Sequence, residues 1–512
     1  MEPFEYEGTF WTVDEPERQV GGRLSYDPAE GSTLSLTGAF ILDPAAALGE
    51  AGKQLVRING LAGGKVLTLE HCLLTNTTIG IGDSITARYY VRYVFAGVRF
   101  ERDEEISFDD LMIRFDQLTY WVGQRPFTVS FESSEPYRLA NVKTSSITYT
   151  FPDVQSGPMQ DGEARLGGVQ SITGDQITEM RIRHQAQLGL HYVEPRDLAG
   201  LTSDINSLQD IITLATDTPT VPEEVVLRRV DITRDRGQGI EAQIPVEMYY
   251  PNAVERVRRE QQRRANEILL PFEKTGGIAT IGKWMGISRQ YRIVVGYLLS
   301  LRYSMKLPEE NRFTNAISAA ETYHRLSPRF PNVIRPRTEY KSYRRKIVKA
   351  VNKVVGVNVG NWVGDMLIFA NEPRLVDRLT ELANHAGTNF TAVVGDVATW
   401  ASVVTTARNR LTHQDESQPF EREIGDLTAL AESLYILMLI CIIRECDVTD
   451  EALANIPNAP RVRFLAAEIQ SIVRRLSKFS IRKPRSSQGT EGAEGAAETV
   501  KGKKPEATGG AE

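Results

Sequence analysis

The chain has 512 residues, of which 41% are hydrophobic and 25% are charged, so it is long enough for two to four domains and has the composition of a globular protein. Its three cysteines, Cys72, Cys441 and Cys446, are too few for a disulfide scaffold and lack the spacing of a zinc site. The acidic N-terminus lacks the apolar core of a signal peptide, and the longest apolar run, 434–443, has about half the length of a membrane span. We therefore expect a cytoplasmic protein with reduced thiols and no membrane partner.

Charge is divided unevenly along the chain. The formal net charge is −6, but residues 1–250 hold 21 Lys and Arg against 37 Asp and Glu, whereas residues 251–512 hold 39 against 29. Such a separation indicates that the second half meets a polyanion and that the first half does not.

Residues 1–252 have the pattern of a β-rich region. Glycines at 21, 22 and 31 mark turns between short segments that have the alternation, or the β-branched and aromatic content, of strands. The expected strands cover 4–10, 34–36, 66–69, 89–95, 146–151, 180–190, 224–231 and 242–250. Apolar residues at helical spacing predict helices over 108–121 and 201–212. We expect an antiparallel, sandwich-like domain, for which a division into sub-layers at about 1–140 and 141–252 is one option.

From about residue 253 the apolar residues recur at helical spacing. The candidate helices cover 253–272, 276–304, 309–326, 337–356, 371–385, 389–412, 425–446 and 461–479. The segment 484–512 is rich in Gly, Ala, Ser, Glu and Lys and has no aromatic residue, which predicts a disordered tail. The expected fold class is therefore multidomain α+β, in which an all-α bundle over 253–483 follows the β-rich region.

Two patterns in the chain suggest a ligand site only at first sight. Gly277 to Lys283 has the glycine and lysine spacing of a phosphate-binding loop, but Trp284 stands where Ser or Thr must ligate magnesium, and Pro271 interrupts the strand that should precede the loop. His184 and His191 have no third metal ligand nearby, and the helical half has no clustered carboxylates for a two-metal nuclease. We expect neither a metal nor another cofactor.

The stretch Arg408-Asn409-Arg410-Leu411-Thr412-His413 carries the chemistry most relevant to function. Histidine exchanges protons near neutral pH and arginine binds phosphate through two parallel hydrogen bonds, so together they suit metal-free RNA cleavage. Because His413 lies about 140° around a regular helix from Arg408, we expect the helix to end near Thr412 with His413 at its terminus. A short motif of this kind also arises by chance, and a plain helix end with a solvated arginine and a capping histidine is the alternative interpretation.

Basic residues interleaved with tyrosines form a second candidate site. The segment 335–353 has eight Lys and Arg, one acidic residue, Glu339, and two tyrosines, Tyr340 and Tyr343. Cations neutralise phosphates and tyrosines stack on unpaired bases, so the segment favours RNA binding, with a solvated helix face as the alternative. The predicted RNA-binding residues are Arg335, Arg337, Lys341, Arg344, Arg345, Lys346 and, within the hexapeptide, Arg410.

Taken in order, these features resemble the ApeA-type anti-phage proteins, in which a β-rich domain precedes a HEPN-like helical domain. The N-terminal likeness rests on Phe4-Glu-Tyr-Glu-Gly-Thr-Phe-Trp11, Gly22-Arg-Leu-Ser-Tyr26 and Leu118-Thr-Tyr-Trp121. The C-terminal likeness rests on Ile268 to Trp284, on Glu310 to Glu321 and on the hexapeptide, which fits the R-N-x-x-x-H signature of HEPN ribonucleases. Together these segments span about residues 1–480, and the tail lies outside the resemblance.

The resemblance implies a ribonuclease in which Arg408 and His413, with Asn409 between them, form the HEPN catalytic motif. It also implies that copies of the chain form a homodimer, or a higher homo-oligomer, through the helical domain. It further implies abortive infection, in which RNA is cut once phage is sensed, and we expect the β-rich domain to regulate the nuclease and to meet a phage-derived trigger. The expected products carry a 2′,3′-cyclic phosphate and a 5′-hydroxyl, and tRNA anticodon loops are one candidate substrate because their bases are already unstacked. The alternatives are a non-catalytic HEPN scaffold that binds RNA or dimerises, and a ligand-binding β domain whose helical half only oligomerises.

Overall fold

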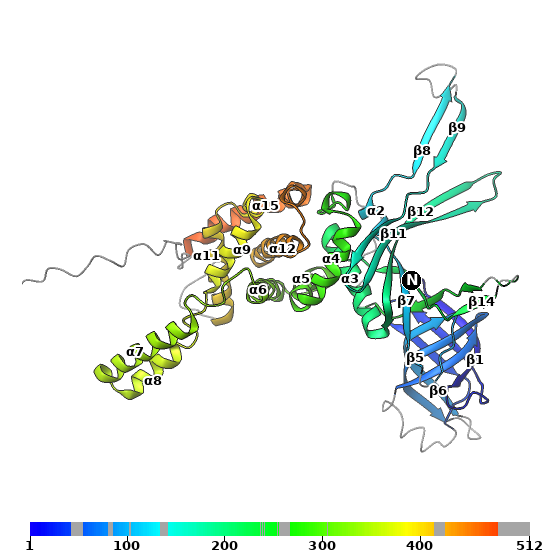
Figure 1. The fold of residues 1–512 in the computed structure, drawn as a ribbon, viewed down its shortest axis with the longest axis horizontal. Helices are drawn as coiled ribbons and strands as arrows, with labels where there is room; N and C mark the ends of the chain where they lie inside the picture. Colours follow the sequence, from blue (N-terminus) through cyan, green and yellow to red (C-terminus); the bar gives the residue numbers. More distant parts are fainter. Residues whose placement is uncertain are drawn as a thin grey trace, which may run out of the picture.

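The computed structural model describes residues 1–41, 55–79, 85–101, 104–133, 142–235, 237, 239, 241–252, 254, 267–304, 306–413 and 425–479. Figure 1 shows a β-rich part and a helical part side by side, with α3, α4 and α5 between them. The predicted fold class, an antiparallel β-rich region followed by an all-α region, is confirmed.

The first six strands close into a barrel. They are β1 (Phe4–Thr12), β2 (Val20–Asp27), β3 (Gly31–Leu36), β4 (Leu55–Ala62), β5 (Lys65–Ile79) and β6 (Ile85–Ala96). Their order is β6-β3-β2-β1-β4-β5, and pairing of β5 with β6 closes the ring. Phe10, Leu34 and Val91 are fully buried in its core, because successive side chains of a strand face opposite sides of the sheet. The expected sandwich-like packing thus takes the form of a sheet that closes on itself.

The sheet continues beyond the barrel as an open layer. Its further strands are β7 (Ser107–Phe115), β10 (Gln155–Met159), β11 (Gly162–Gly174), β12 (Met180–Asp197), β13 (Pro222–Arg228) and β16 (Val246–Tyr249). Helices α2 (Leu118–Val122) and α3 (Leu198–Thr216) pack on this layer. Two separate hairpins complete the β-rich part: β8 (Phe127–Ser133) with β9 (Val142–Tyr149), and β14 (Thr233–Asp235) with β15 (Glu241–Gln243). The first of them projects far from the layer (Figure 1).

The helix predicted over 108–121 is wrong for most of its length. Residues 107–115 form strand β7, which lies between β12 and β13, and only Leu118–Val122 is helical. Leu111, Ile113 and Phe115 are buried at a period of two. Pairing with two neighbouring strands satisfies the backbone here, and this tertiary context overrides a local spacing that also fits a helix.

The second part of the chain is helical. Its elements are η3 (Glu273–Thr275), α4 (Ile278–Gln290), α5 (Arg292–Tyr303), α6 (Glu309–Leu326), α7 (Arg337–Val355), α8 (Val357–Met366), α9 (Leu375–Ala386), α10 (Thr388–Val394), α11 (Val397–His413), α12 (Asp426–Arg444), α13 (Asp450–Leu453), α14 (Asn455–Asn458), α15 (Pro460–Leu476) and η4 (Ser477–Phe479). Helix α12 is central, and α6, α9, α10 and α15 pack around it. Among the described helices α12 is long and apolar enough to cross a membrane, but 94% of its apolar window is buried inside the protein.

Two helices predicted as continuous are broken. The segment 276–304 forms α4 and α5, which meet at the buried Tyr291, and the segment 389–412 forms α10 and α11, which are bent by 63°. The second break lies at Gly395, whose φ of 75° is left-handed and cannot continue a helix. The predicted helices 309–326 and 337–356 are confirmed, and α8 was not predicted. Most of the predicted helix 253–272 and the whole tail 484–512 lie outside the described residues.

A buried ion network joins the two parts of the molecule. Arg302 on α5 donates through Nε to Asp217, the C-cap of α3, at 2.5 Å, and through Nη1 and Nη2 to Glu432 on α12 at 2.9 and 2.8 Å. Its guanidinium carbon also lies 3.7 Å from the centre of the Tyr435 ring. Burial by itself raises the pKa of Glu432, but the charge and hydrogen bonds of Arg302, followed by other arginines, lower it to about 2. Glu432 is therefore ionised inside the core.

Replacing Arg302 with Met should lower the stability of the folded protein by about 3–5 kcal/mol at pH 7, because two carboxylates are left buried without their main partner. Thermal unfolding followed by circular dichroism measures the loss, and Arg463→Met, at an exposed arginine of α15, is the control. Glu432 contributes stability above its ordinary pKa of 4.5 and loses it as pH falls towards 2, so the difference between wild type and Arg302→Met should narrow over that range. Equal melting temperatures for the two variants at pH 7 would contradict this role.

Candidate functional site

The hexapeptide lies at the C-terminal end of α11, whose first half is anchored in the core. Asp396 caps the helix by accepting from the Thr399 amide at 2.8 Å, and the fully buried Trp400 donates through Nε1 to the Ser433 hydroxyl of α12 at 2.9 Å. Burial continues to Ala407 and then gives way to partly exposed residues. The helix is thus a fixed support that presents its last turns to solvent.

Arg408, Asn409 and Arg410 are partly exposed on these last turns. Nη1 of Arg408 donates to Oδ1 of Asn409 at 3.4 Å, and the Thr412 hydroxyl donates to the Arg408 carbonyl at 2.9 Å. Helix α11 ends at His413, one residue beyond the predicted end, and the His413 side chain lies outside the described residues. Residues 408 and 413 therefore occupy positions on one helix that are about 140° apart around its axis.

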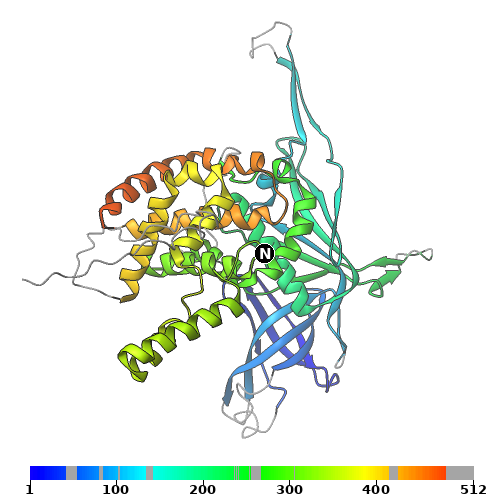
Figure 2. The same cartoon turned by 60° about the vertical axis from the view of Figure 1, so that its left-hand side comes forward.

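Of the other predicted RNA-binding residues, Arg335 lies just before α7 and the rest lie on it. Helix α7 pairs with α8 in a helical hairpin that stands out from the bundle (Figures 1 and 2). Nε of Arg344 donates to the Gly364 carbonyl at 2.9 Å and ties the two helices together. Asn371 holds the base of the hairpin, because its side chain accepts from the Arg335 amide at 3.0 Å and donates to the Arg335 carbonyl at 2.9 Å. Helix α7 has no buried residue, so its cations face solvent or the neighbouring cleft.

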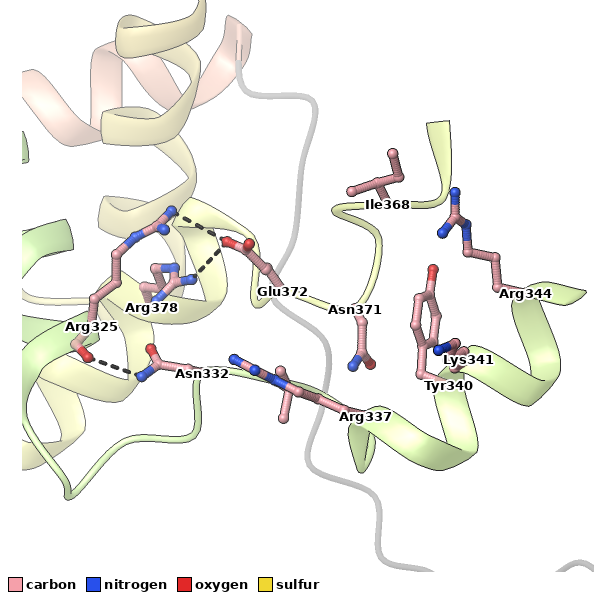
Figure 3. A pocket seen from close by; sticks show the side chains of 11 residues that line it. Arg325, Asn332, Arg337, Tyr340, Lys341, Arg344, Ile368, Asn371, Glu372 and Arg378 are labelled. Atoms are coloured by element: carbon pink, nitrogen blue, oxygen red, sulfur yellow. Dashed lines mark hydrogen bonds and ion pairs between the residues drawn. The ribbon is translucent and has the colours of Figure 1, made fainter. Parts of the chain in front are cut away.

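A cleft of about 490 Å³ lies at the base of this hairpin (Figure 3). The residues that line it are Arg325, Asn332, Val333, Arg337, Tyr340, Lys341, Arg344, Ile368, Asn371, Glu372 and Arg378. Its one carboxylate, Glu372, already pairs with Arg325 at 3.3 Å and Arg378 at 3.5 Å. Arg337 and Lys341 form no ion pair with any residue that the structure describes. The cleft therefore has surplus positive charge.

The guanidinium of Arg378 contributes to this positive charge although its side chain is buried. Its side chain is only 2% exposed, and burial, together with the charge of Arg325, lowers its pKa. Nη1 of Arg378 donates to Nδ1 of the fully buried His324 at 2.8 Å, so Nε2 of His324 carries the proton that bonds to Glu381 at 2.7 Å. Burial lowers the pKa of His324, which keeps the ring neutral beside Arg378.

The structure brings together only some of the predicted site residues. Arg337, Lys341 and Arg344 recur at helical spacing and line the cleft, whereas Arg345 and Lys346 are exposed on other faces of α7. Arg335 instead pairs with Glu339 at 3.1 Å. The cleft lining does not include Arg408, Asn409 or Arg410, so the two candidate regions are separate places on one domain.

Sequence reasoning missed the second wall of the cleft. Arg325 ends α6, Glu372 precedes α9 and Arg378 lies in the first turns of α9, so these side chains are far apart in the sequence and have no shared pattern. No sequence signal could have found them, because only the packing of α6 against α9 brings them together.

The glycine and lysine segment at 277–283 and the three cysteines, which sequence analysis did not interpret as ligand sites, have structural roles. Gly277 precedes helix α4, and a Cβ at Gly282 would lie 2.1 Å from the Pro158 carbonyl, so Gly282 lets α4 pack on β10. The three cysteines are buried and unpaired, as expected. Within the described ranges no three His, Cys, Asp or Glu side chains are placed to hold a metal ion.

Comparison with family models finds two matches. The model described as ApeA N-terminal domain 1 matches residues 5–284, more than half of the chain, and the model described as Apea-like HEPN matches residues 314–452. The first match extends beyond the predicted domain boundary at 252 and includes α4, which packs on β10 and β11. The second includes the α7–α8 hairpin and all of α11. No curated protein and no solved structure matches the chain.

Protonating His324 should destabilise the folded protein, because the added charge is buried beside Arg378. The pKa of His324 is lowered on folding, so its contribution to stability is present above the ordinary value of 6.5 and is lost as pH falls below it. The melting temperature of wild type should therefore fall further between pH 7.5 and about pH 5 than that of His324→Gln, because glutamine does not titrate there. His71→Gln, in the barrel, is the matched control, and parallel curves for wild type and His324→Gln would argue against this charge clash.

Proposed function

The chain belongs to the ApeA family, and from this premise we propose that it is an endoribonuclease of an anti-phage abortive-infection system, which cuts RNA without a metal ion. The family resemblance found in the sequence is confirmed, and a HEPN domain by itself indicates a nuclease or an RNA-related role. The observation that carries the finer proposal is the position of Arg408 and Asn409. They reach solvent at the end of a helix whose other half is fixed in the core, within the segment that the HEPN model matches.

The reaction follows from the chemistry of the three motif residues. The ribose 2′ oxygen attacks the adjacent phosphorus, and the bond from phosphorus to the 5′ oxygen breaks. A base accepts the 2′ proton, and an acid protonates the leaving 5′ oxygen. His413 acts as base or acid, and the C-terminal end of α11 favours its protonated form. Arg408 stabilises the charge that develops on the phosphate oxygens, and Asn409 orients the phosphate or the second motif. The products carry a 2′,3′-cyclic phosphate and a 5′-hydroxyl.

A homodimer makes this acid–base pair available. One copy has a single His413, and residues 408 and 413 occupy different sides of the same helix. Two copies related by a twofold axis would place two motifs across one cleft, so that one His413 acts as base and the other as acid. We therefore place activity in a dimer formed through the helical domain, in the cytoplasm where the RNA is.

The α7 cations are proposed to hold the RNA backbone. Arg337, Lys341 and Arg344 converge on the basic cleft with Arg325 and Arg378, where charge-assisted hydrogen bonds to phosphate oxygens are available. The remaining predicted contacts, Arg335, Arg345, Lys346 and Arg410, would extend this surface. The substrate class we favour is single-stranded loops such as tRNA anticodons. The acidic β-rich region is proposed to regulate the nuclease and to receive a phage-derived trigger.

Substituting His413 with Ala should abolish the cleavage, because the reaction loses its proton carrier, and Arg408→Ala should lower it by about two orders of magnitude or more. The measurement is sequencing of RNA ends with 5′-hydroxyls in bacteria with and without phage, together with cleavage by purified protein in the presence of EDTA. His71→Ala is the control. Folded, dimeric wild type that produces no His413-dependent ends under any phage would favour the non-catalytic scaffold, and strong inhibition by EDTA would contradict the metal-free mechanism.

Reversing two charges of the cleft, in Arg337→Glu with Lys341→Glu, should weaken RNA binding uniformly across sequences and reduce the salt slope of the binding constant by about two, because each phosphate contact contributes nearly one unit. Neither residue is buried, so the melting temperature should stay unchanged. Fluorescence anisotropy with a labelled single-stranded RNA at several salt concentrations measures both quantities. Arg463→Glu is the control, and an unaltered salt slope in the double variant would rule out the cleft as the phosphate site.

A further inference from the structure

A second and larger cleft lies where the barrel meets the helices, away from the motif on α11. Its volume is about 860 Å³, which suits a small-molecule ligand, and junctions between domains are common places for such sites. One wall is the outer face of β6, and the other consists of α3 and α5. The predicted catalytic and RNA-binding residues are not part of its lining.

Helix α3 presents a polar stripe to this cleft. Thr202, Ser203, Asn206, Gln209 and Asp210 recur at three- and four-residue spacing and line it, while the opposite face of α3 is buried in the core. Tyr303 of α5 donates to Asp210 at 2.6 Å. Burial raises the pKa of Asp210 to about 7, so near neutral pH its carboxyl is partly protonated and can both donate and accept a hydrogen bond.

Two arginines face the cleft from its opposite walls. Arg92 on β6 and Arg292 on α5 are both exposed, and neither forms an ion pair with a residue in the described ranges. The Arg92 guanidinium lies 5.4 Å from the centre of the Tyr93 ring. A third lining arginine, Arg289, is already neutralised by carboxylates of the β-rich part. The two unpaired arginines favour an anionic ligand that bridges barrel and helices.

Several polar atoms of the lining have no partner. Oη of Tyr250, Nδ2 of Asn252 and Nε of Arg289 are buried and form no hydrogen bond with the described residues. A buried polar atom without a partner is costly, so the residues around this cleft retain hydrogen-bonding capacity that the described residues do not satisfy.

A glycine keeps part of the cleft open. Gly296 lies in the middle of α5, where glycine disfavours a helix relative to alanine, and no atom lies within 4 Å of a Cβ built on it. Glycine is therefore not needed here to avoid a clash within the protein. Its lack of a side chain leaves space on the cleft wall.

We propose that this junction cleft binds a phosphorylated ligand of the ribonucleotide class. Arg92 and Arg292 hold the phosphates, the hydroxyl, amide and carboxyl groups of α3 bond to the polar edges of base and ribose, and Tyr90 offers a stacking face for the base. Such a ligand contacts the barrel and α5 at once and fixes the β-rich part against the helices. Binding at this cleft does not require cleavage at His413, so either proposal can fail without the other.

The test is thermal unfolding and calorimetric titration of the full chain with ATP, GTP, CTP and UTP, each in turn, and with inorganic triphosphate. At least one nucleotide should raise the melting temperature and bind saturably. Gly296→Leu fills the cleft and Arg92→Ala with Arg292→Ala removes its cations, and each change should weaken that binding by about tenfold or more. Gly286→Leu, in the middle of α4 with equally open space and no part in the cleft, should bind like wild type.

Three results would overturn the proposal. The first is that none of the four nucleotides alters the melting temperature of wild type. The second is that binding survives unchanged in Gly296→Leu, which would place the nucleotide elsewhere, for example on the basic cleft of α7. The third is that inorganic triphosphate binds as tightly as the nucleotides, which would leave only a general anion site.

Discussion

The burial of Arg302 is the constraint on which the arrangement of the two parts depends. A guanidinium in a core is tolerated only where carboxylates and an aromatic face surround it. Those partners come from the end of α3, which belongs to the β-rich part, and from the central helix α12. Arg312 of α6 and Arg461 of α15 contact the same carboxylates, so that four helices and the α3 cap meet at one charge cluster. None of these elements can shift far without leaving a buried charge unpaired.

In the helical part, buried residues support the candidate site residues, and the site residues themselves are exposed. Trp400 and Ser433 fix the first half of α11 against the most buried helix of the molecule, and only the last turns reach solvent. The basic cleft at the α7–α8 hairpin is built in the same way. Arg378 is buried and bonded to His324, whereas Arg337 and Lys341 are left exposed and unpaired by described residues. In both places buried neighbours hold groups that remain exposed to solvent.

The junction cleft and the buried ion network share two helices. Asp210 and Asp217 are about two turns apart at the end of α3, and Arg292 and Arg302 lie at the two ends of α5. A ligand that bridges Arg92 of the barrel and Arg292 would therefore act on the same helix that carries Arg302 to Glu432 on α12. This gives the β-rich part a direct physical connection to the centre of the helical part.

The sequence by itself determined the family, the change from strands to helices, and the elements with a strong period, such as 309–326 and 337–356. It also singled out Arg408, Asn409 and His413, because contiguous residues keep their spacing in any fold. Tertiary structure alone decided that 107–115 is a strand between two others, that the helix breaks at Gly395, and that the strands close a barrel. It alone brought Arg325, Glu372 and Arg378 to the α7 cations, and the two walls of the junction cleft to each other. The physical reason is that a local pattern records which side of an element is buried, whereas a cleft depends on which elements pack against each other, and that is fixed by contacts between residues far apart in the chain.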